Sequence, residues 1–323
     1  MLPVYKKTLG VAFVLAATLG TAYATGPKFA VMFFDSQGFC GGIQEGITEG
    51  SKGAGAELIL SNSKLDAAAE ATFIDSAIAS GVDGLIVSPV SETASVVALE
   101  RAHEVGIPII CYNTCLGADD TGRLVAGFVT TDQYDFGYQL GKSAAAYVEA
   151  NAIDLKLGIL NCDVAEVCKQ RKAGFLAALS EGLGGTVTPV ADQEGYITDK
   201  ATQTTTEMLT ANPENNLIYT ANEGGTVGAV LGVDAADKAG STVVFGSDAD
   251  TQILEMLKSA EVLKGIIAQD PQQMGRRAVE LALAAASGTP SAERSVLIPS
   301  RVYLSDDTAG IEEWLTVHAD GIS

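Results

Sequence analysis

The stretch that best indicates the fold is Ile107-Pro108-Ile109-Ile110-Cys111-Tyr112-Asn113-Thr114. Its apolar run is unbroken, as expected for a strand that is buried on both faces of a parallel sheet. The run then ends in two polar side chains, Asn113 and Thr114. Ligands of open α/β sheets bind outside the carboxyl ends of the strands. The stretch therefore predicts a parallel sheet with a binding site at its edge.

Several other short apolar runs end in the same way. Asn222, Asp248 and Gln269 each follow one of them. Parallel strands present their carboxyl ends at one edge of a sheet, so these side chains are candidates for contacting a small, neutral, hydroxyl-rich molecule. The pattern predicts a binding cleft and shows no group of residues that is typical of a catalytic centre.

Apolar runs and helical stretches alternate along the chain, which predicts parallel sheets with right-handed crossovers. Their number suits two sheets of roughly five or six strands better than one large sheet. The polar segment Thr130-Thr131-Asp132 is the best candidate for a crossing between the sheets. The expected strands are residues 28–34, 57–60, 85–87, 107–112, 124–129, 157–160, 187–190, 217–220, 242–246, 264–268 and 296–304. The expected helices are residues 40–54, 67–79, 92–104, 134–149, 166–179, 202–210, 227–237, 253–259 and 274–286.

The chain is acidic, with 20 Lys and Arg against 40 Asp and Glu and a formal net charge of −20. Such a charge repels nucleic acid and anionic membrane surfaces, so neither is expected as a partner. Residues 1–24 are typical of a secretory signal peptide: two lysines precede an apolar stretch and the cleavage motif Ala22-Tyr23-Ala24. We expect a cleaved signal and a mature chain in the periplasm. An uncleaved membrane anchor is the alternative.

Disulfides are expected in that compartment, and an odd number of cysteines leaves at least one thiol outside them. A zinc site is the alternative, but neither Cys111-x3-Cys115 nor Cys162-x5-Cys168 includes a histidine, and His103 and His318 are the only two in the sequence, so no metal is expected. The five cysteines are Cys40, Cys111, Cys115, Cys162 and Cys168.

Sequence spacing alone does not fix the pairing of these cysteines. A Cys162–Cys168 bond would close one loop, and a Cys40–Cys115 bond would join two loops at the same end of a sheet. Cys111 lies within an apolar strand, where we expect it to be a buried small hydrophobic residue. The four disulfide candidates are therefore Cys40, Cys115, Cys162 and Cys168.

Motifs for common catalytic chemistry are missing from the chain. There is no HExxH and no GxSxG. Residues 137–143 (Gly-Tyr-Gln-Leu-Gly-Lys-Ser) resemble a phosphate-binding loop but are one residue short, and they are typical of a helix interior. We therefore expect a binding protein that needs no cofactor, and not an enzyme.

The order and spacing of the strand ends resemble a known family. The residues that carry the resemblance are 33–46, 107–114, 170–175, 219–223, 243–248 and 266–271. Over about Phe29 to Leu304 the chain is similar to the type I periplasmic sugar-binding proteins, close to the ribose-binding subfamily of ABC-transporter receptors. The resemblance implies two Rossmann-like α/β lobes joined by three hinge strands, with the ligand between them.

The resemblance also implies lobe boundaries, partners and a ligand site. The first lobe would comprise residues 25–131 and 270–300, and the second residues 132–269 and 301–323. The partners would be a small neutral sugar or polyol and a membrane permease, with the receptor itself a monomer. By matching motif position, the sugar-contacting residues would be Gln37, Phe39, Asn113, Thr114, Arg171, Tyr196, Asn222, Asp248 and Gln269.

The chain departs from the ribose-type pattern on the first lobe. An Asp-Arg pair is replaced by Asn113-Thr114, an Asn by Gln37 and a second aromatic by Cys40. The charged fork that grips several sugar hydroxyls is therefore lost, while Arg171 and Asp248 retain one charge of each sign. A neutral monosaccharide, a small or acyclic polyol, or a furanose is the expected ligand.

Most of these residues have an ordinary structural alternative. Asn222 and Asp248 could cap the helices that follow them. Phe39 and Tyr196 could belong to the core, and Gln269 could be part of a hinge. The expected function is capture of a sugar or sugar alcohol for an ABC importer. A sensor of the same fold that signals to a membrane kinase or chemoreceptor is the alternative.

Overall fold

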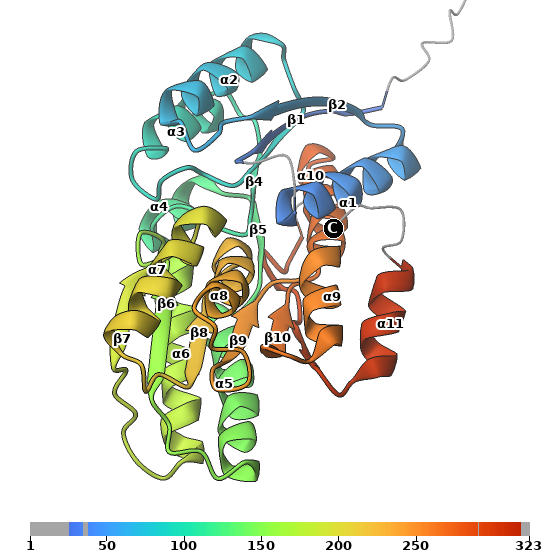
Figure 1. The fold of residues 1–323 in the computed structure, drawn as a ribbon. Coiled ribbons are helices and arrows are strands. Elements are labelled where there is room, and N and C mark those ends of the chain that lie inside the picture. The colour runs from blue at the N-terminus through green and yellow to red at the C-terminus, as the bar shows by residue number, and fades with distance from the viewer. Residues whose placement is uncertain (1–25, 35–37, 290, 318–323) are drawn as a thin grey trace, which may run out of the picture.

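The computed structural model describes residues 26–34, 38–289 and 291–317. Within these residues the chain forms two six-stranded sheets, each covered by helices (Figure 1). The predicted signal peptide and Gln37 lie outside the described residues. None of the described helices is long and apolar enough to cross a membrane.

The first lobe is built on a parallel sheet with helices on both faces. Ile43 and Met274 pack on one face, and Ile74 and Leu99 pack on the other. The strands in spatial order are β11 (Ser295–Leu297), β5 (Gly127–Thr130), β4 (Ile109–Tyr112), β3 (Gly84–Val87), β1 (Lys28–Phe33) and β2 (Glu57–Asn62). Its helices are α1 (Phe39–Ala54), α2 (Ala67–Ala79), α3 (Val96–Glu104), α4 (Ala118–Leu124) and α10 (Pro271–Ala286).

The second lobe repeats this arrangement, except that its edge strand β12 runs antiparallel to β10. Phe136 and Phe175 pack on one face of the sheet, and Ile253 and Val230 pack on the other. The strands in spatial order are β12 (Arg301–Leu304), β10 (Leu263–Ala268), β9 (Val243–Ser247), β8 (Leu217–Thr220), β6 (Leu157–Asn161) and β7 (Ala191–Glu194). Its helices are α5 (Gln133–Ala150), α6 (Glu166–Gly182), α7 (Thr198–Ala211), α8 (Glu223–Ala235), α9 (Thr251–Ser259) and α11 (Thr308–Val317).

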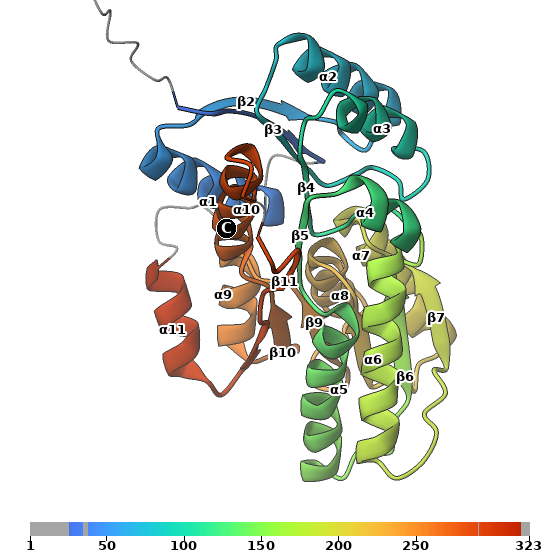
Figure 2. The same cartoon turned by 180° about the vertical axis from the view of Figure 1, so that it is seen from behind.

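The chain passes from one lobe to the other between β5 and α5, between β10 and α10, and between β11 and β12. Both views show these segments running side by side in the middle of the molecule (Figures 1 and 2). The predicted class, two lobes with mainly parallel sheets, is confirmed. The predicted lobe boundaries at residues 131, 269 and 300 remain proposals.

The predicted strand at residues 296–304 is wrong as a single strand. It is divided into β11 and β12, which belong to different sheets, with Pro299 between them. Proline cannot donate to a strand ladder, so it interrupts the pairing. The predicted strand at residues 124–129 also began too early. Leu124 ends α4 and is buried, so its apolar character belongs to helix packing.

Other boundaries also differ: α7 and α8 each begin four residues before the predicted helices at residues 202–210 and 227–237. The strand expected at residues 187–190 is β7, Ala191–Glu194, which is a largely exposed edge strand without an apolar pattern. The helix expected from residue 92 begins at Val96, because Ser91 Oγ accepts hydrogen bonds from the backbone of the preceding turn. The C-terminal segment forms α11, whose Ile311 is buried in the core of the second lobe.

Candidate ligand-binding site

The predicted site residues come from the carboxyl ends of the strands and from two helices. Asn113 and Thr114 follow β4, Asn222 follows β8, Asp248 follows β9, Gln269 follows β10 and Tyr196 follows β7. Arg171 lies in α6, and Phe39 is the first residue of α1. Both sheets thus contribute polar side chains to the region between the lobes.

Arg171 is the most constrained residue of this group, with a relative exposure of 4%. Its Nε donates to Gln133 Oε1 at 2.7 Å, and its Nη1 donates to the carbonyl oxygen of Ala221 at 3.0 Å. Nη1 also lies 3.4 Å from Asp248 Oδ2. The guanidinium carbon lies 4.2 Å from the centre of the Phe136 ring. Nε and Nη1 carry the hydrogen bonds of the guanidinium to the described residues, so the group is fixed in place while Nη2 makes no hydrogen bond to that part of the chain.

The position of Arg171 depends on the close packing of α5 against α6. A Cβ atom on Gly137 would lie 1.8 Å from the carbonyl oxygen of Arg171, and one on Gly174 would lie 2.0 Å from that of Tyr134. Only glycine permits this approach. Residues 137–143, whose sequence resembles a phosphate loop, are indeed helix interior, and the role of Gly137 is to let the helices meet.

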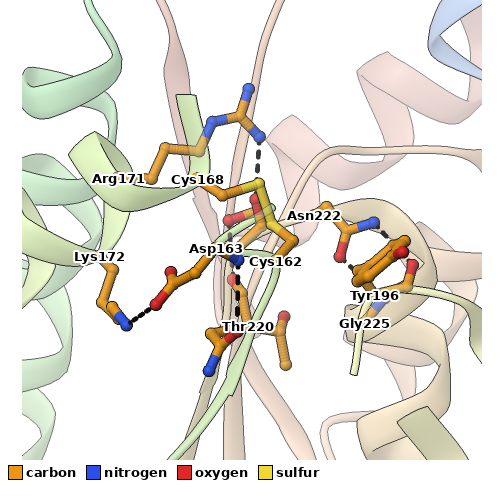
Figure 3. Close-up of a disulfide and its surroundings, with 12 residues drawn as sticks. Cys162, Asp163, Cys168, Arg171, Lys172, Tyr196, Thr220, Asn222 and Gly225 are labelled. Carbon is orange, nitrogen blue, oxygen red and sulfur yellow. Dashed lines mark hydrogen bonds and ion pairs between the residues drawn. A yellow bond between two sulfur atoms is a disulfide. The ribbon is translucent and has the colours of Figure 1, made fainter. Parts of the chain in front are cut away.

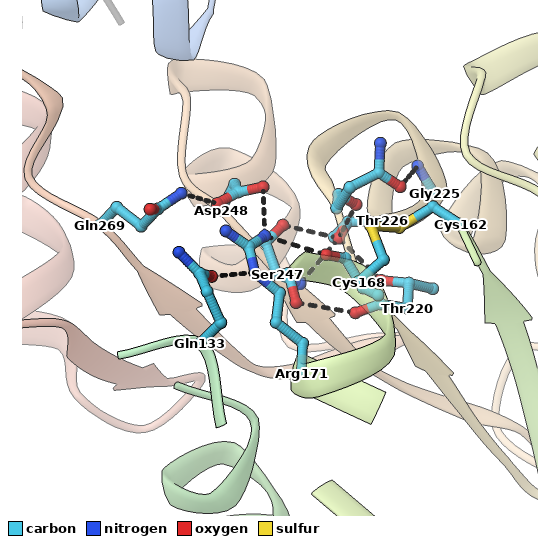
Figure 4. Close-up of polar contacts among 12 residues, drawn as sticks. Gln133, Cys162, Cys168, Arg171, Thr220, Gly225, Thr226, Ser247, Asp248 and Gln269 are labelled. Carbon is cyan, nitrogen blue, oxygen red and sulfur yellow. Dashed lines mark hydrogen bonds and ion pairs between the residues drawn. A yellow bond between two sulfur atoms is a disulfide. The ribbon is translucent and has the colours of Figure 1, made fainter. Parts of the chain in front are cut away.

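Asp248 connects Arg171 to Gln269. Its Oδ1 accepts a hydrogen bond from Gln269 Nε2 at 3.2 Å, while its Oδ2 faces Arg171. The Asp248 backbone has a φ of 67°, in the left-handed region that Asp tolerates better than most residues. Gln133, Arg171, Asp248 and Gln269 therefore form one continuous sequence of contacts, here called the four-residue polar chain (Figure 4).

Asn222 has the capping role that was its structural alternative. Its Oδ1 accepts from the Gly225 N–H at 3.2 Å at the start of α8, and its Nδ2 donates to the Tyr196 carbonyl oxygen at 2.8 Å (Figure 3). Asp248 is not the cap of the next helix, because Asp250 caps α9 by accepting from Ile253. Burial raises the pKa of Asp250 above its ordinary value, although backbone hydrogen bonds oppose this shift.

Buried hydroxyl groups support the strand ends beneath Asn222 and Asp248. Thr226 Oγ1 donates to the Ser247 carbonyl oxygen at 2.8 Å and accepts from the Ser247 N–H at 2.9 Å. Ser247 Oγ donates to the carbonyl oxygen of Thr220 at 2.8 Å. These bonds tie β8 to β9 and fix the direction in which the following residues leave the sheet.

The first lobe presents Asn113 and Thr114 at the edge of a groove of about 550 Å³. The second lobe lines the same groove with Gln133, Lys169 and Gln170. Asn113 has a φ of 58°. Thr114 Oγ1 lies 2.9 Å from Ser88 Oγ, which ties it to the end of the neighbouring strand.

The two aromatic candidates are both half-buried. Phe39 stacks on Phe34, with ring centres 6.4 Å apart, and packs on the first-lobe core. Tyr196 packs on a second-lobe core cluster.

The two lobes come close together at Gly38, where an added Cβ atom would lie 2.5 Å from Glu223 Oε2. The start of α1 and the start of α8 therefore approach each other across the gap between the lobes.

The structure corrects the cysteine pairing. Cys111 is bonded to Cys115, so the predicted Cys40–Cys115 pair is wrong, as is the prediction that Cys111 stays outside a disulfide. The Cys162–Cys168 bond is present as predicted. Cys40 is buried and belongs to neither bond.

Both disulfides lie beside predicted site residues. The Cys111–Cys115 ring encloses Asn113 and Thr114. Cys168 is three residues before Arg171 at the start of α6 (Figure 3). Lys172 pairs with Asp163 inside the Cys162–Cys168 loop.

Within the described parts of the chain, no cluster of His, Cys, Asp and Glu is arranged to hold a metal ion.

Sequence reasoning missed Gln133. It stands at the start of an ordinary amphipathic helix, and nothing in its neighbours marks it as buried. Its exposure is only 4%, and it holds the Nε of Arg171. A polar residue directly after the predicted crossing at Thr130-Thr131-Asp132 is the one signal that would have identified it.

Comparisons with known proteins agree with this geometry. Residues 28–290 match the model of the periplasmic binding protein domain. The chain is 33% identical to the ABC transporter periplasmic-binding protein YphF of Escherichia coli K12, over 99% of this chain and all of that protein. It is 25% identical to the D-allose-binding periplasmic protein of the same organism, over 81% of this chain and 85% of that one.

A solved structure is similar along most of the chain. It is a periplasmic solute-binding protein of an ABC transporter from Actinobacillus succinogenes 130z with bound D-allose. The TM-score is 0.80 at 26% identity, and the match covers 88% of this chain and 99% of that one. The resemblance described from the strand ends is thereby confirmed.

Proposed function

The chain belongs to the periplasmic binding protein family, and from this premise we propose that it captures a neutral monosaccharide or sugar alcohol for an ABC importer. The ligand lies between the lobes and is released unchanged to a membrane permease. The protein acts as a monomer in the periplasm after its signal peptide is removed. The lobes comprise residues 25–131 with 270–300 and residues 132–269 with 301–323.

The observation that carries this proposal is the four-residue polar chain. It contains one guanidinium and one carboxylate that face each other, so the chain carries no net charge toward a ligand. It also combines hydrogen-bond donors with acceptors, as a hydroxyl-rich guest requires. A buried polyol exchanges hydrogen bonds with water for bonds with protein at a net gain of about 0.5–1.5 kcal/mol each.

The first-lobe wall of the groove, formed by Asn113 and Thr114, limits which sugars are suitable ligands. Asn113 and Thr114 are neutral and short, and they line the groove that leads to Gln133. They cannot provide the charged fork that grips adjacent hydroxyls of a ribose-type pyranose. A furanose, a small polyol or a cyclitol suits such a wall, and Phe39 or Tyr196 would supply an apolar surface for its C–H groups.

A thermal-shift screen tests the proposal. The panel contains D-allose, D-ribose, D-arabinose, myo-inositol, tetritols, pentitols and hexitols, with gluconate as a charged control. A ligand at 100 times its Kd should stabilise the native state by about 2.7 kcal/mol. Stabilisation by a neutral member and none by gluconate supports the proposal. If no neutral member raises the unfolding temperature, the proposal is wrong.

The second candidate function is ligand sensing for a membrane kinase or chemoreceptor. Binding to the closed lobes would be common to both roles, since the same cleft closes over the ligand. Reconstitution with an ABC permease separates them, because only an import receptor stimulates ligand-dependent ATP hydrolysis by the transporter.

A further inference from the structure

Gln133 is a polar residue that the fold buries at a crossing between the lobes. It is the first residue of α5, directly after Asp132, whose side chain caps the helix by accepting from the Asp135 N–H at 2.9 Å. Its exposure is 4%. Its Oε1 accepts from Arg171 Nε at 2.7 Å. Its Nε2, however, is buried without a hydrogen-bond partner among the described residues.

Gln269 has the complementary feature. Its Nε2 donates to Asp248, while its Oε1 is buried without a partner in the described part of the chain. Leaving a buried polar atom unpaired costs about 1–3 kcal/mol, and native proteins contain few such atoms. One unpaired donor and one unpaired acceptor therefore occur at the two ends of the same four-residue polar chain.

We propose that Gln133 is a ligand-contacting, specificity-determining residue: its Nε2 donates to one ligand hydroxyl, which in turn donates to Gln269 Oε1. This inference rests on the proposed function and specifies one of its contacts. A hydroxyl both accepts and donates, so a single group satisfies both unpaired atoms. An ether oxygen cannot do so, because it has no hydrogen. The ligand therefore presents a free hydroxyl at this place, and not a ring or glycosidic oxygen.

The arrangement of the side chains is consistent with one shared guest. Figure 4 shows the amide nitrogen of Gln133 directed to the side of Arg171 on which Asp248 and Gln269 lie. The Oε1 of Gln133 is already occupied by Arg171 Nε. The amide orientation that satisfies Arg171 thus leaves the donor directed toward the guest, so Gln133 both positions the guanidinium and contacts the ligand.

Two variants separate these two roles. Gln133→Glu keeps the acceptor for Arg171 Nε but replaces the ligand-facing donor by an acceptor. Gln133→Met keeps the size of the side chain and removes both polar functions. Gln139→Glu is the matched control, because Gln139 lies on the same helix with a more exposed side chain that bonds Asp135. All three are titrated calorimetrically with the tightest-binding neutral member of the screening panel and with its monodeoxy analogues.

For the wild type and Gln139→Glu we expect one deoxy analogue to lose about tenfold in affinity through this contact. In Gln133→Glu and Gln133→Met the penalty for that same missing hydroxyl should fall well below tenfold, because only its bond to Gln269 is left to lose, while the penalties for the other missing hydroxyls persist. A smaller penalty for one missing hydroxyl alone supports the proposal. A purely structural role of Gln133 would instead weaken binding of the whole series together.

Three results would overturn the inference. If Gln133→Glu binds the whole series like the wild type, Gln133 only positions Arg171. If both variants lower the affinity for every analogue by the same factor, Gln133 does not contact any particular ligand hydroxyl. In both cases the wild type still binds its ligand and the proposed function stands. If the wild type binds no panel member, the proposed function and the inference fail together. Should Gln133→Met fail to fold, Gln133→Glu decides the outcome alone.

Discussion

Arg171 and Asp248 are 77 residues apart in the sequence, yet their side chains lie 3.4 Å apart and are only 4% and 13% exposed. One comes from a helix of the second lobe, and the other follows a central strand of the same lobe. Charges buried to this degree are retained only when each is paired or hydrogen-bonded. The pair is completed by Gln133 on one side and Gln269 on the other.

Arg171→Ala should abolish measurable ligand binding and lower the free energy of unfolding by about 3 kcal/mol. The substitution leaves the Asp248 carboxylate without its partner, which is more costly than losing the pair as a whole. The double variant Arg171→Ala/Asp248→Asn should regain part of the stability but none of the binding. Urea unfolding and calorimetric titration measure the two quantities separately.

The control for this prediction is Arg123→Ala. Arg123 is 49% exposed and pairs with Glu100 and Asp120 on the surface of the first lobe. Exposed ion pairs contribute little. Affinity in Arg123→Ala should therefore equal that of the wild type. Wild-type affinity in Arg171→Ala would instead exclude the guanidinium from the site.

Gly137→Ala should weaken ligand binding although residue 137 does not contact the ligand. The added methyl group would lie 1.8 Å from the carbonyl oxygen of Arg171, so α5 and α6 must separate. Overpacking of this kind costs about 1–3 kcal/mol or more. We expect a lower unfolding midpoint in urea and at least a tenfold loss of affinity, because Arg171 moves away from Gln133 and Phe136.

Gly53→Ala provides the matched comparison for Gly137→Ala. Gly53 is also in a helix and is exposed, and a methyl group added there would have no atom within 4 Å. Replacing such a glycine by alanine stabilises a helix by about 0.5–1 kcal/mol. Opposite signs for the two substitutions would identify helix contact, and not helix propensity, as the cause. Equal effects would contradict the packing argument.

The sequence predicts the parallel sheets and the polar strand ends because both follow from short-range patterns. Asn113 and Asp248 stand directly after apolar runs, where the chain must leave the sheet. Gln133 could not be identified in this way, since its burial depends on α6 and on Arg171, 38 residues later. Contacts between elements distant in the sequence decide which polar residue is buried.

The cysteine error has a similar origin. Cys111 was interpreted as a strand residue that simply packs, and the strand does extend to Tyr112. Asn113 then adopts a φ of 58°, which reverses the chain and brings Cys115 back to Cys111, with the Cα atoms 5.5 Å apart. Residue pattern alone does not reveal a left-handed residue that is not glycine.

Removing the disulfides should reduce both stability and ligand affinity. The Cys111–Cys115 and Cys162–Cys168 loops are short, so each bond contributes about 2 kcal/mol by restricting the unfolded chain. In the double variant Cys111→Ala/Cys115→Ala, the ring that encloses Asn113 and Thr114 is opened. We expect this double variant to bind ligand more weakly, because Asn113 and Thr114 would lose conformational freedom when the ligand binds.

Cys162→Ala/Cys168→Ala distinguishes preorganisation from stability alone. This bond holds the loop before α6, and its loss should affect the contact of the ligand with Arg171. Measuring affinity well below the unfolding temperature of each variant separates the two effects. Unchanged affinity in both double variants would show that the disulfides stabilise the fold without preparing the site.

Glu70 is a buried glutamate in α2 that holds the segment leading into the first-lobe groove. It is 1% exposed, and its Oε2 accepts from the Val90 N–H at 2.8 Å. Its Oε1 has no partner among the described residues. Burial raises the pKa of Glu70 above the 4.5 of an exposed glutamate, against the opposing effect of hydrogen bonds from Ser95 and Val90.

The raised pKa of Glu70 makes the stability of the protein depend on pH. Because the folded-state pKa is higher, the native state binds a proton more tightly than the unfolded state does. The contribution of Glu70 to stability is therefore most favourable at low pH and declines as the pH rises from about 4.5 through the folded-state pKa. Gln can accept the same Val90 hydrogen bond without carrying a charge, so Glu70→Gln should remove this decline.

Urea unfolding between about pH 4 and pH 8 tests the effect. Relative to the wild type, Glu70→Gln should gain stability as the pH rises, whereas Glu104→Gln, at an exposed site in α3, should follow the wild-type curve. Ligand affinity of Glu70→Gln at neutral pH should be no lower than that of the wild type. The introduced glutamine would still accept the hydrogen bond from the Val90 N–H that holds residues 88–95, and it would carry no buried charge. A Glu70→Gln curve parallel to that of the wild type would show that Glu70 keeps an ordinary pKa in the native state.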